Sequence, residues 1–296
     1  MNFSLINNSE ETTSFFNKLV NYINLPNNMI TDVFIDIYET TELTIDALMY
    51  LLAIMMNLKS KHLKKYRFHG NSPKEENVKK LLTDSGFYRF VNYHGNEPLS
   101  QSNNTIQIVS GEKCQTELAK RLSDFVAEKA NVSFISCRFL YEICIELMSN
   151  SHKHAYFRKK NNAYPRWYCF AEYDEENRIS FTFVDTGSGI PSTVKKNFAE
   201  TIDFLKLKGN HKYVVSALNG DFRTSTKKYN RGKGLPKIKE ISATHKINNL
   251  HIITNKADVK VCGEETTSYD MNHSLMGTLY YWEIDLNTLK EEFYAN

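Results

Sequence analysis

The apolar positions in the first third of the chain predict a small α/β unit. The stretch after Thr31 alternates apolar and polar residues, which indicates a strand whose apolar face carries Val33, Ile35 and Ile37. After a turn, four apolar residues recur at helical spacing: Ile45, Leu48, Leu51 and Leu52. A second strand is expected at 66–69, followed by a second helix that begins near Ser72 and stops at Gly86. This βαβα order predicts a small α/β domain.

The apolar pattern of the remaining chain predicts helices layered on one face of a mixed sheet. Residues 112–130 and 133–158 have helical spacing, so two helices are expected before any strand. Strands are then expected at four segments: 167–173, 178–184, 250–254 and 278–284. Between them, residues 207–234 are rich in Gly, Asn, Lys and Thr and have weak periodicity. A connection of this length indicates a functional lid.

Polar, turn-forming residues at 96–105 separate the two parts of the chain. We therefore expect a small α/β domain at 1–110 and a larger domain at 111–296, in the α+β or α/β class. Of the 296 residues, 41% are hydrophobic, which is enough for a buried core in each part.

Charge and composition exclude some classes of function. With 37 basic and 34 acidic residues, the net charge of +3 is too small to favour a nucleic-acid partner. The longest apolar run, 47–56, is too short to span a bilayer, and the N-terminus does not resemble a signal peptide, so no membrane partner is expected. Five cysteines without paired metal spacing fit a reducing compartment. We expect a cytoplasmic protein.

One predicted helix carries candidate ligands for a metal and for phosphate. At roughly 100° per residue, four polar residues of the helix 133–158 share one face: Glu142, Glu146, Asn150 and Lys153. A carboxylate and an amide one turn apart can orient a hydrated magnesium ion and a water, and a nearby lysine suits phosphate. The alternative is the solvent-exposed face of an ordinary amphipathic helix.

Three glycine-containing segments add further candidates. Asp185 follows a strand, and its carboxylate can accept a hydrogen bond from an exocyclic amine, while Gly187 and Gly189 let a flat ring or a phosphate approach the backbone. Gly232 and Gly234 precede a helix, whose free amides and dipole can hold phosphate. Gly277 and Thr278 begin the last strand. Taken singly, these segments are also typical of a glycine turn, a helix entry and a strand start.

The order of these segments is more specific than any one of them. The chain contains these segments in a fixed order. A helix with a carboxylate and an amide comes first, then a strand that ends in DxGxG, then a flexible segment, then GxGL before a helix, and finally GT on a strand. Over roughly residues 112–290 the sequence resembles the GHKL superfamily, the ATP-binding domains of histidine kinases, gyrase B, Hsp90, MutL and anti-sigma-factor kinases. The stretch ELMSNSHKHAY is closest to the histidine-kinase branch. The resemblance implies a Bergerat-type α/β sandwich that binds ATP or ADP with Mg2+.

The resemblance also implies a role for each motif residue. Asn150 would coordinate magnesium, Glu146 would act as general base and reach the metal through water, and Lys153 would contact phosphate. The adenine side would be formed by residues at the strand ends, with Asp185 reading the amino group: Asp185, Gly187, Gly189, Ile190, Gly277 and Thr278. The triphosphate end would be closed by the GxGL segment: Gly232, Lys233, Gly234 and Leu235.

Residues 207–231 would form the mobile lid over the nucleotide. Four of its basic residues would contact phosphate or a partner, or else remain solvated: Arg223, Lys227, Lys228 and Arg231. His152 and His154 lie beside the helix motif and are interpreted as packing residues.

The N-terminal region resembles a STAS-type domain, as in anti-sigma-factor antagonists, through VFIDIYETTELTIDALMYLLAIM and LLTDSGFYRF. The usual phosphorylatable serine is not evident, and Thr44 is the nearest hydroxyl. The alternative is a generic small α/β interaction domain. In either case we expect a protein partner to contact this region, and a second copy of the chain is a further candidate partner.

Three functions remain open. The first is an ATP-dependent enzyme that hydrolyses ATP or passes its phosphoryl group to a protein. The second is a nucleotide-gated interaction module, in which ATP changes the surface offered to a partner and turnover is small. The third, a nucleic-acid-associated ATPase of the MutL or gyrase kind, gains little from the net charge.

Overall fold

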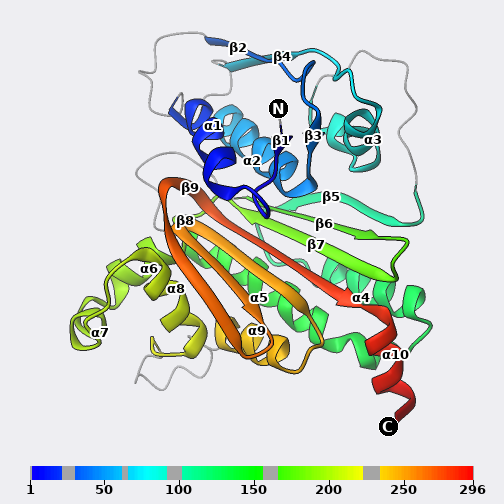
Figure 1. Ribbon diagram of the computed structural model, residues 1–296, viewed down its shortest axis with the longest axis vertical. Coiled ribbons are helices and arrows are strands. Elements are labelled where there is room, and N and C mark those ends of the chain that lie inside the picture. Colours follow the sequence, from blue (N-terminus) through cyan, green and yellow to red (C-terminus); the bar gives the residue numbers. More distant parts are fainter. Residues whose placement is uncertain are drawn as a thin grey trace.

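A five-stranded sheet runs through the centre of the protein (Figure 1). The computed structural model describes residues 2–21, 31–61, 66–91, 102–155, 166–222 and 234–295. The strands of the sheet are, in spatial order, β5 (Thr105–Gly111), β6 (Trp167–Tyr173), β7 (Arg178–Asp185), β9 (Glu265–Asp285) and β8 (Asn248–Cys262). The mixed α and β content agrees with the expected α+β class.

All neighbouring strands of this sheet are antiparallel, which corrects the expectation of a mixed sheet. For two of the four strand pairs the cause is a short connection. Residues 174–177 join β6 to β7, and Asn177 adopts φ 58° there. Two residues join β8 to β9, and Gly263 adopts φ 58°. Such tight turns reverse the chain and force antiparallel pairing, whereas periodicity identifies strands without giving their direction.

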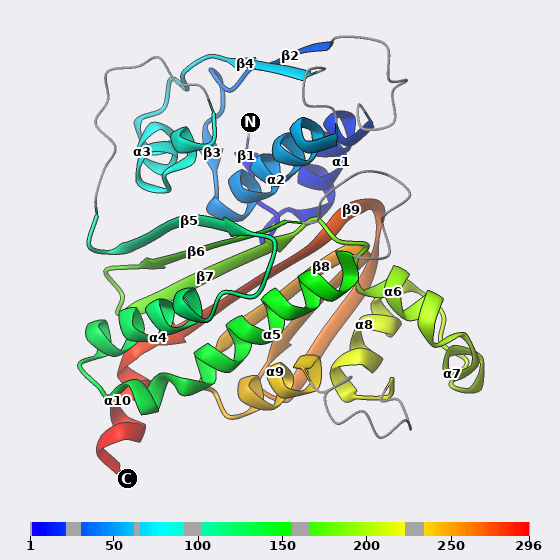
Figure 2. The same ribbon diagram turned by 180° about the vertical axis from the view of Figure 1, so that it is seen from behind.

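Three helices cover one face of the sheet (Figure 2): α4 (Thr116–Ala130), α5 (Arg138–Ala155) and α9 (Gly234–Ala243). The apolar stripe of α5 is at most 3% exposed, as its spacing predicts: Leu140, Ile143, Cys144, Leu147 and Met148. It packs with aromatic residues of the sheet, including Trp167, Phe181 and Phe183. Burying each large apolar side chain contributes roughly 1.5–3 kcal/mol, so this face supplies much of the core.

The N-terminal region covers the other face of the sheet. Helices α1 (Ser9–Asn21) and α2 (Ile45–Lys61) share a second apolar core with sheet residues, among them Tyr168 and Phe170 of β6. Their neighbours Trp167 and Cys169 point into the first core, because side chains alternate along a strand. The Tyr50 hydroxyl of α2 also accepts a hydrogen bond of 2.8 Å from the Met276 amide of β9. The sheet is therefore buried on both faces.

The strand, turn and helix expected after Thr31 are present, but the strands of this region form two separate two-stranded sheets. Strand β2 (Thr31–Ile35) pairs in parallel with β4 (Tyr66–Gly70), and β1 (Asn2–Phe3) pairs in parallel with β3 (Glu42–Leu43). Helix α3 (Glu76–Asp84) ends just before Gly86, whose φ of 73° suits glycine, and η2 (Phe87–Arg89) follows. The order predicted from periodicity is confirmed here.

Several elements differ from the sequence-based expectation. Strand β5 precedes α4, so a strand comes before the two helices, and the expected boundary at residue 110 falls within this strand. Helix α8 (Asn210–Asn219) lies in the segment 207–234, which was expected to be irregular, and α6 (Ile190–Asn197) and α7 (Ala199–Phe204) lie before it, where no element was expected. The helix expected at 133–158 is divided into η3 (Phe134–Cys137) and α5, and α10 (Leu286–Ala295) follows the sheet. Among the described helices, none is long and apolar enough to cross a membrane.

A carboxylate from the sheet caps the N-terminus of α8. Asp270 of β9 accepts hydrogen bonds from the Asn210 amide (3.0 Å) and the His211 amide (2.8 Å). Partial burial alone would raise the pKa of Asp270, but the hydrogen bonds from His211 and Asn210 outweigh it and hold the pKa below its usual value. The ionised cap therefore fastens α8 to the long β8–β9 hairpin.

We expect Asp270→Asn to lower the free energy of unfolding by about 1 kcal/mol at neutral pH, as for other lost helix caps. Because the folded-state pKa is depressed, this stabilisation is complete above the ordinary aspartate pKa of about 3.9 and disappears as the pH falls through the folded value. Urea denaturation of both proteins at neutral pH and at about pH 3 measures this difference. Asp221→Asn, at the exposed far end of α8, is the control; equal effects of the two changes at neutral pH would contradict the cap.

Candidate functional site

Two of the sequence motifs meet at the paired ends of β7 and β9. Asp185, the last residue of β7, lies directly opposite Thr278 of β9. Gly277 has φ 84° and lies so close that a Cβ atom there would collide with the Asp185 carbonyl oxygen. Asp185 and Thr278 are both buried, at 8% and 2% exposure. The GT motif therefore packs on the backbone that carries the aspartate.

We expect Gly277→Ala to lower the free energy of unfolding by roughly 2–3 kcal/mol, because alanine is strained at positive φ and its methyl group meets the Asp185 backbone. Thermal and urea denaturation measure the loss. The control is Gly70→Ala. This glycine lies in a strand, its φ is not positive, and an added Cβ atom would lie 3.0 Å from a carbonyl oxygen. A Gly277→Ala protein as stable as the control would contradict the close approach.

A hydroxyl and an amide from β8 hold the segment that follows Asp185. The Thr254 hydroxyl accepts a hydrogen bond from the Ile190 amide (3.1 Å), donates to the Gly277 carbonyl (2.9 Å) and lies 3.1 Å from the Thr278 hydroxyl. The Asn255 side chain donates to the Ser188 carbonyl at 3.1 Å. Sequence reasoning missed both residues, because their role depends on β8 pairing with β9 at a bulge.

The Asp185 carboxylate also organises its own loop. Its Oδ1 atom accepts a hydrogen bond of 2.6 Å from the Gly187 amide, the contact expected of an ordinary glycine turn. Gly189 has φ 84°, and a Cβ atom there would lie 2.6 Å from the Asn255 side chain. Ile190 begins α6 and is half-buried. Both glycines therefore allow close packing, and side chains of β8 contact the loop through hydrogen bonds.

Two other motifs meet where α5 passes the start of α9. Glu146 and Asn150 lie one turn apart on α5, and both are half-buried. Gly234, the first residue of α9, packs so tightly on Glu146 that a Cβ atom would overlap its carboxyl group. Leu235 is half-buried and packs against the first core. In contrast, Glu142 is exposed and pairs with Arg138 at 3.4 Å, so it lies outside this contact.

Tyr280 of β9 links the two clusters and was not singled out from the sequence. Burial raises the pKa of its hydroxyl well above the usual value, and the nearby charges of Asp185 and Glu146 raise it further. Tyr280 is 3% exposed and belongs to the core that α5 covers. The charges of the aspartate at the end of β7 and of the glutamate of α5 therefore both act on the same buried tyrosine, although 39 positions separate them in the sequence (185 − 146).

Some of the predicted site residues lie outside this description. Gly232 and Lys233 fall outside the described residues, as do all four basic residues of the expected lid, and the same holds for the side chains of Lys153 and His154. His152 is described, and its Nδ1 atom lies 3.1 Å from the Glu112 carbonyl oxygen, which agrees with a packing role. Helix α8 occupies part of the segment expected to be a lid.

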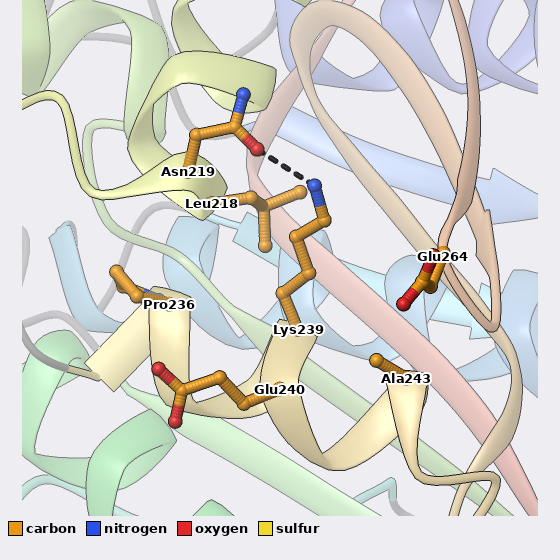
Figure 3. A pocket seen from close by; sticks show the side chains of 7 residues that line it. All are labelled: Leu218, Asn219, Pro236, Lys239, Glu240, Ala243 and Glu264. Carbon is orange, nitrogen blue, oxygen red and sulfur yellow. Dashed lines mark hydrogen bonds between the residues drawn. The ribbon is translucent and has the colours of Figure 1, made fainter.

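A separate depression of about 440 Å³ lies among α8, α9 and the turn between β8 and β9 (Figure 3). Its rim is polar, and the Lys239 ammonium donates a hydrogen bond of 2.7 Å to the Asn219 side chain across it. The lining residues are Leu218, Asn219, Pro236, Lys239, Glu240, Ala243 and Glu264. None of them is a residue of the four motifs, so this depression is distinct from the candidate site.

The oxygen atoms of Glu146 and Asn150 suit a magnesium ion, which prefers oxygen ligands and keeps several waters. No cluster of three or more His, Cys, Asp and Glu side chains arranged for a metal occurs in the described ranges. No protein-family model matches the chain, and a comparison with curated proteins gives no match.

Proposed function

We propose that the chain binds Mg-ATP in the manner of the histidine-kinase-like ATPases and hydrolyses it or transfers its phosphoryl group to a protein. One observation carries the proposal: the four motifs meet in two pairs, with Gly277 packed on the Asp185 backbone and Gly234 packed on Glu146. Two such pairs suit a single nucleotide site, which needs an adenine end and a phosphate end.

Each residue has a role that its chemistry allows. Asp185 accepts a hydrogen bond from the adenine amino group, and the Thr278 hydroxyl opposite it assists directly or through water. Glu146 takes a proton from the attacking water or hydroxyl, and Asn150 offers an oxygen ligand to the metal. Bound magnesium supplies charge neutralisation at the phosphates. The amides at the start of α9 face the phosphate end, where the helix dipole favours negative charge.

A nucleotide-gated interaction module is the second candidate, and the end of β7 favours it. Asp185 belongs to the candidate site, while its neighbour Val184 packs in the second core with α2. Ile190, which follows the Asp185 loop, begins α6. A shift of this loop on nucleotide binding therefore reaches both the N-terminal region and α6–α8.

Incubation of the purified protein with magnesium and γ-labelled ATP tests the two candidates together. Free phosphate, or label on protein, supports an ATP-dependent enzyme. Calorimetric ATP binding with neither product supports the gated module. Absence of binding at millimolar ATP would contradict both.

A further inference from the structure

Helices α6, α7 and α8 form an arm with a small core of its own. Val194, Tyr213 and Phe222 are buried together, and half-buried apolar residues such as Phe198 and Ile202 pack on them. In both overall views α7 extends away from the sheet and from the N-terminal region (Figures 1 and 2). The arm therefore places α7 away from the rest of the molecule.

The tip of this arm is both apolar and basic. Phe204 is 83% exposed and Leu205 is 38% exposed. Lys206 and Lys208 follow directly, are exposed, and pair with no carboxylate of the described residues. Residues 190–219 contain five lysines and two acidic residues, a formal charge of +3 (5 − 2). An exposed aromatic ring beside free lysines is typical of a contact with an acidic apolar surface.

The outer side of β2 and the turn after it provide such a surface on the same chain. Four alternate residues there are exposed and form what we term the β2 stripe: Asp32, Phe34, Asp36 and Tyr38. Phe34 is 62% exposed and Tyr38 is 48% exposed. Hydrogen bonds from Asn71 and the Tyr38 amide lower the pKa of Asp36, so it is ionised at neutral pH. Glu39, next in the turn, is also exposed.

We propose that the arm tip of one copy docks on the β2 stripe of a second copy. Within one molecule the two surfaces lie on different parts of the structure (Figure 1), so a single chain does not bring them together. Asp36 and Glu39 are opposite in charge to Lys206 and Lys208, whereas Asp32 also lies 3.4 Å from His69 and beside Arg67 of β4. Each surface contributes two of the nine large hydrophobic residues that are exposed among the described residues. Because both surfaces belong to one chain, they are always present in equal amounts. Such head-to-tail contacts close reciprocally into a dimer or continue into a chain of subunits.

Sedimentation velocity of the full chain over a range of concentrations tests this association. We expect the wild type to associate, and the dissociation constant to rise about tenfold or more between low and high salt, because exposed charges are screened. Phe204→Ala removes the apolar anchor and should weaken association about tenfold or more. Ile135→Ala, at an 80% exposed residue outside both surfaces, is the matched control and should leave it unchanged.

A charge exchange identifies the paired surfaces. We expect association to be abolished by the double change Lys206→Glu with Lys208→Glu, and likewise by the double change Asp32→Lys with Glu39→Lys. A chain that carries all four changes should associate again. The double change Lys120→Glu with Arg121→Glu, at exposed residues of α4, controls for net charge.

Failure of the four-change protein to associate would overturn the proposal, as would a wild type that stays monomeric at high micromolar concentration. Binding of such a monomer to vesicles with anionic lipid, lost in the Lys206→Glu, Lys208→Glu protein, would assign the arm to a membrane surface instead. ATP binding is measured in parallel in the Phe204→Ala protein, whose changed residue lies outside the segment 207–231, and is expected to match the wild type, so the inference stands or fails independently of the proposed function.

Discussion

If the chain turns over ATP as proposed, we expect Glu146→Ala to lower the turnover by roughly 100- to 10,000-fold, the range typical of losing a general base. Glu146 is the carboxylate of α5 that contacts the start of α9, where the phosphates would bind. Its truncation removes the proton acceptor while the adenine contacts at β7 and β9 remain. We therefore expect ATP affinity within a few-fold of wild type. Steady-state release of free phosphate, and label transfer to protein, measure the loss.

Glu142→Ala provides the matched control for this prediction. Glu142 lies one turn earlier on the same helix but is exposed and paired with Arg138 at 3.4 Å. Its loss should leave turnover unchanged and cost little stability, since exposed ion pairs contribute less than about 1 kcal/mol. Equal turnover in the Glu146→Ala and Glu142→Ala proteins would exclude Glu146 as the base.

We expect Asp185→Asn to weaken ATP binding by roughly 10- to 100-fold, because the proposed charge-assisted hydrogen bond to the adenine amino group would be lost. The amide retains an oxygen that can accept from the Gly187 amide, so the loop and the fold should survive. Isothermal titration calorimetry with ATP gives the affinity, and thermal denaturation checks the fold. GTP has no exocyclic amine at this position, so we expect the affinities of the two proteins for GTP to differ less than their affinities for ATP.

Asp174→Asn is the corresponding control. Asp174 lies at the opposite end of β7, where its carboxylate pairs with Arg178 at 3.1 Å. We expect this change to leave ATP affinity unaltered. An Asp185→Asn protein that binds ATP as tightly as wild type would show that the carboxylate serves only its own glycine turn.

Periodicity predicted the strongly patterned elements because their local sequence and their burial agree. The stripe of α5 is apolar at every third or fourth residue, and all of its described members are buried. Strand β5 was missed because its apolar residues, Ile106 and Ile108, follow a polar stretch and occupy the edge of the sheet. Helices α6–α8 were missed because their apolar residues form a separate, small core that local composition does not reveal.

Sequence order identified the candidate site residues, but not the residues that hold them. Thr254 and Asn255 stabilise the Asp185 loop only because a bulge in β8 aims both side chains at it. Tyr280 could be found by counting two residues forward from Thr278 along an alternating strand, yet the effect of the Glu146 charge on it depends on how α5 crosses the sheet. Neither relation can be recognised from the local sequence.

The sequence by itself determined the main helices, most strands, the glycines that positive φ requires and the four segments that suit a nucleotide, since these depend on local propensity and spacing. Only the tertiary structure decided that the sheet is antiparallel, that α1 and α2 cover its second face, and that Gly277 packs on Asp185 and Gly234 on Glu146. The physical reason is that strand direction, register and layer packing are fixed by contacts between residues far apart in the chain, and these contacts are selected by burial of the whole core.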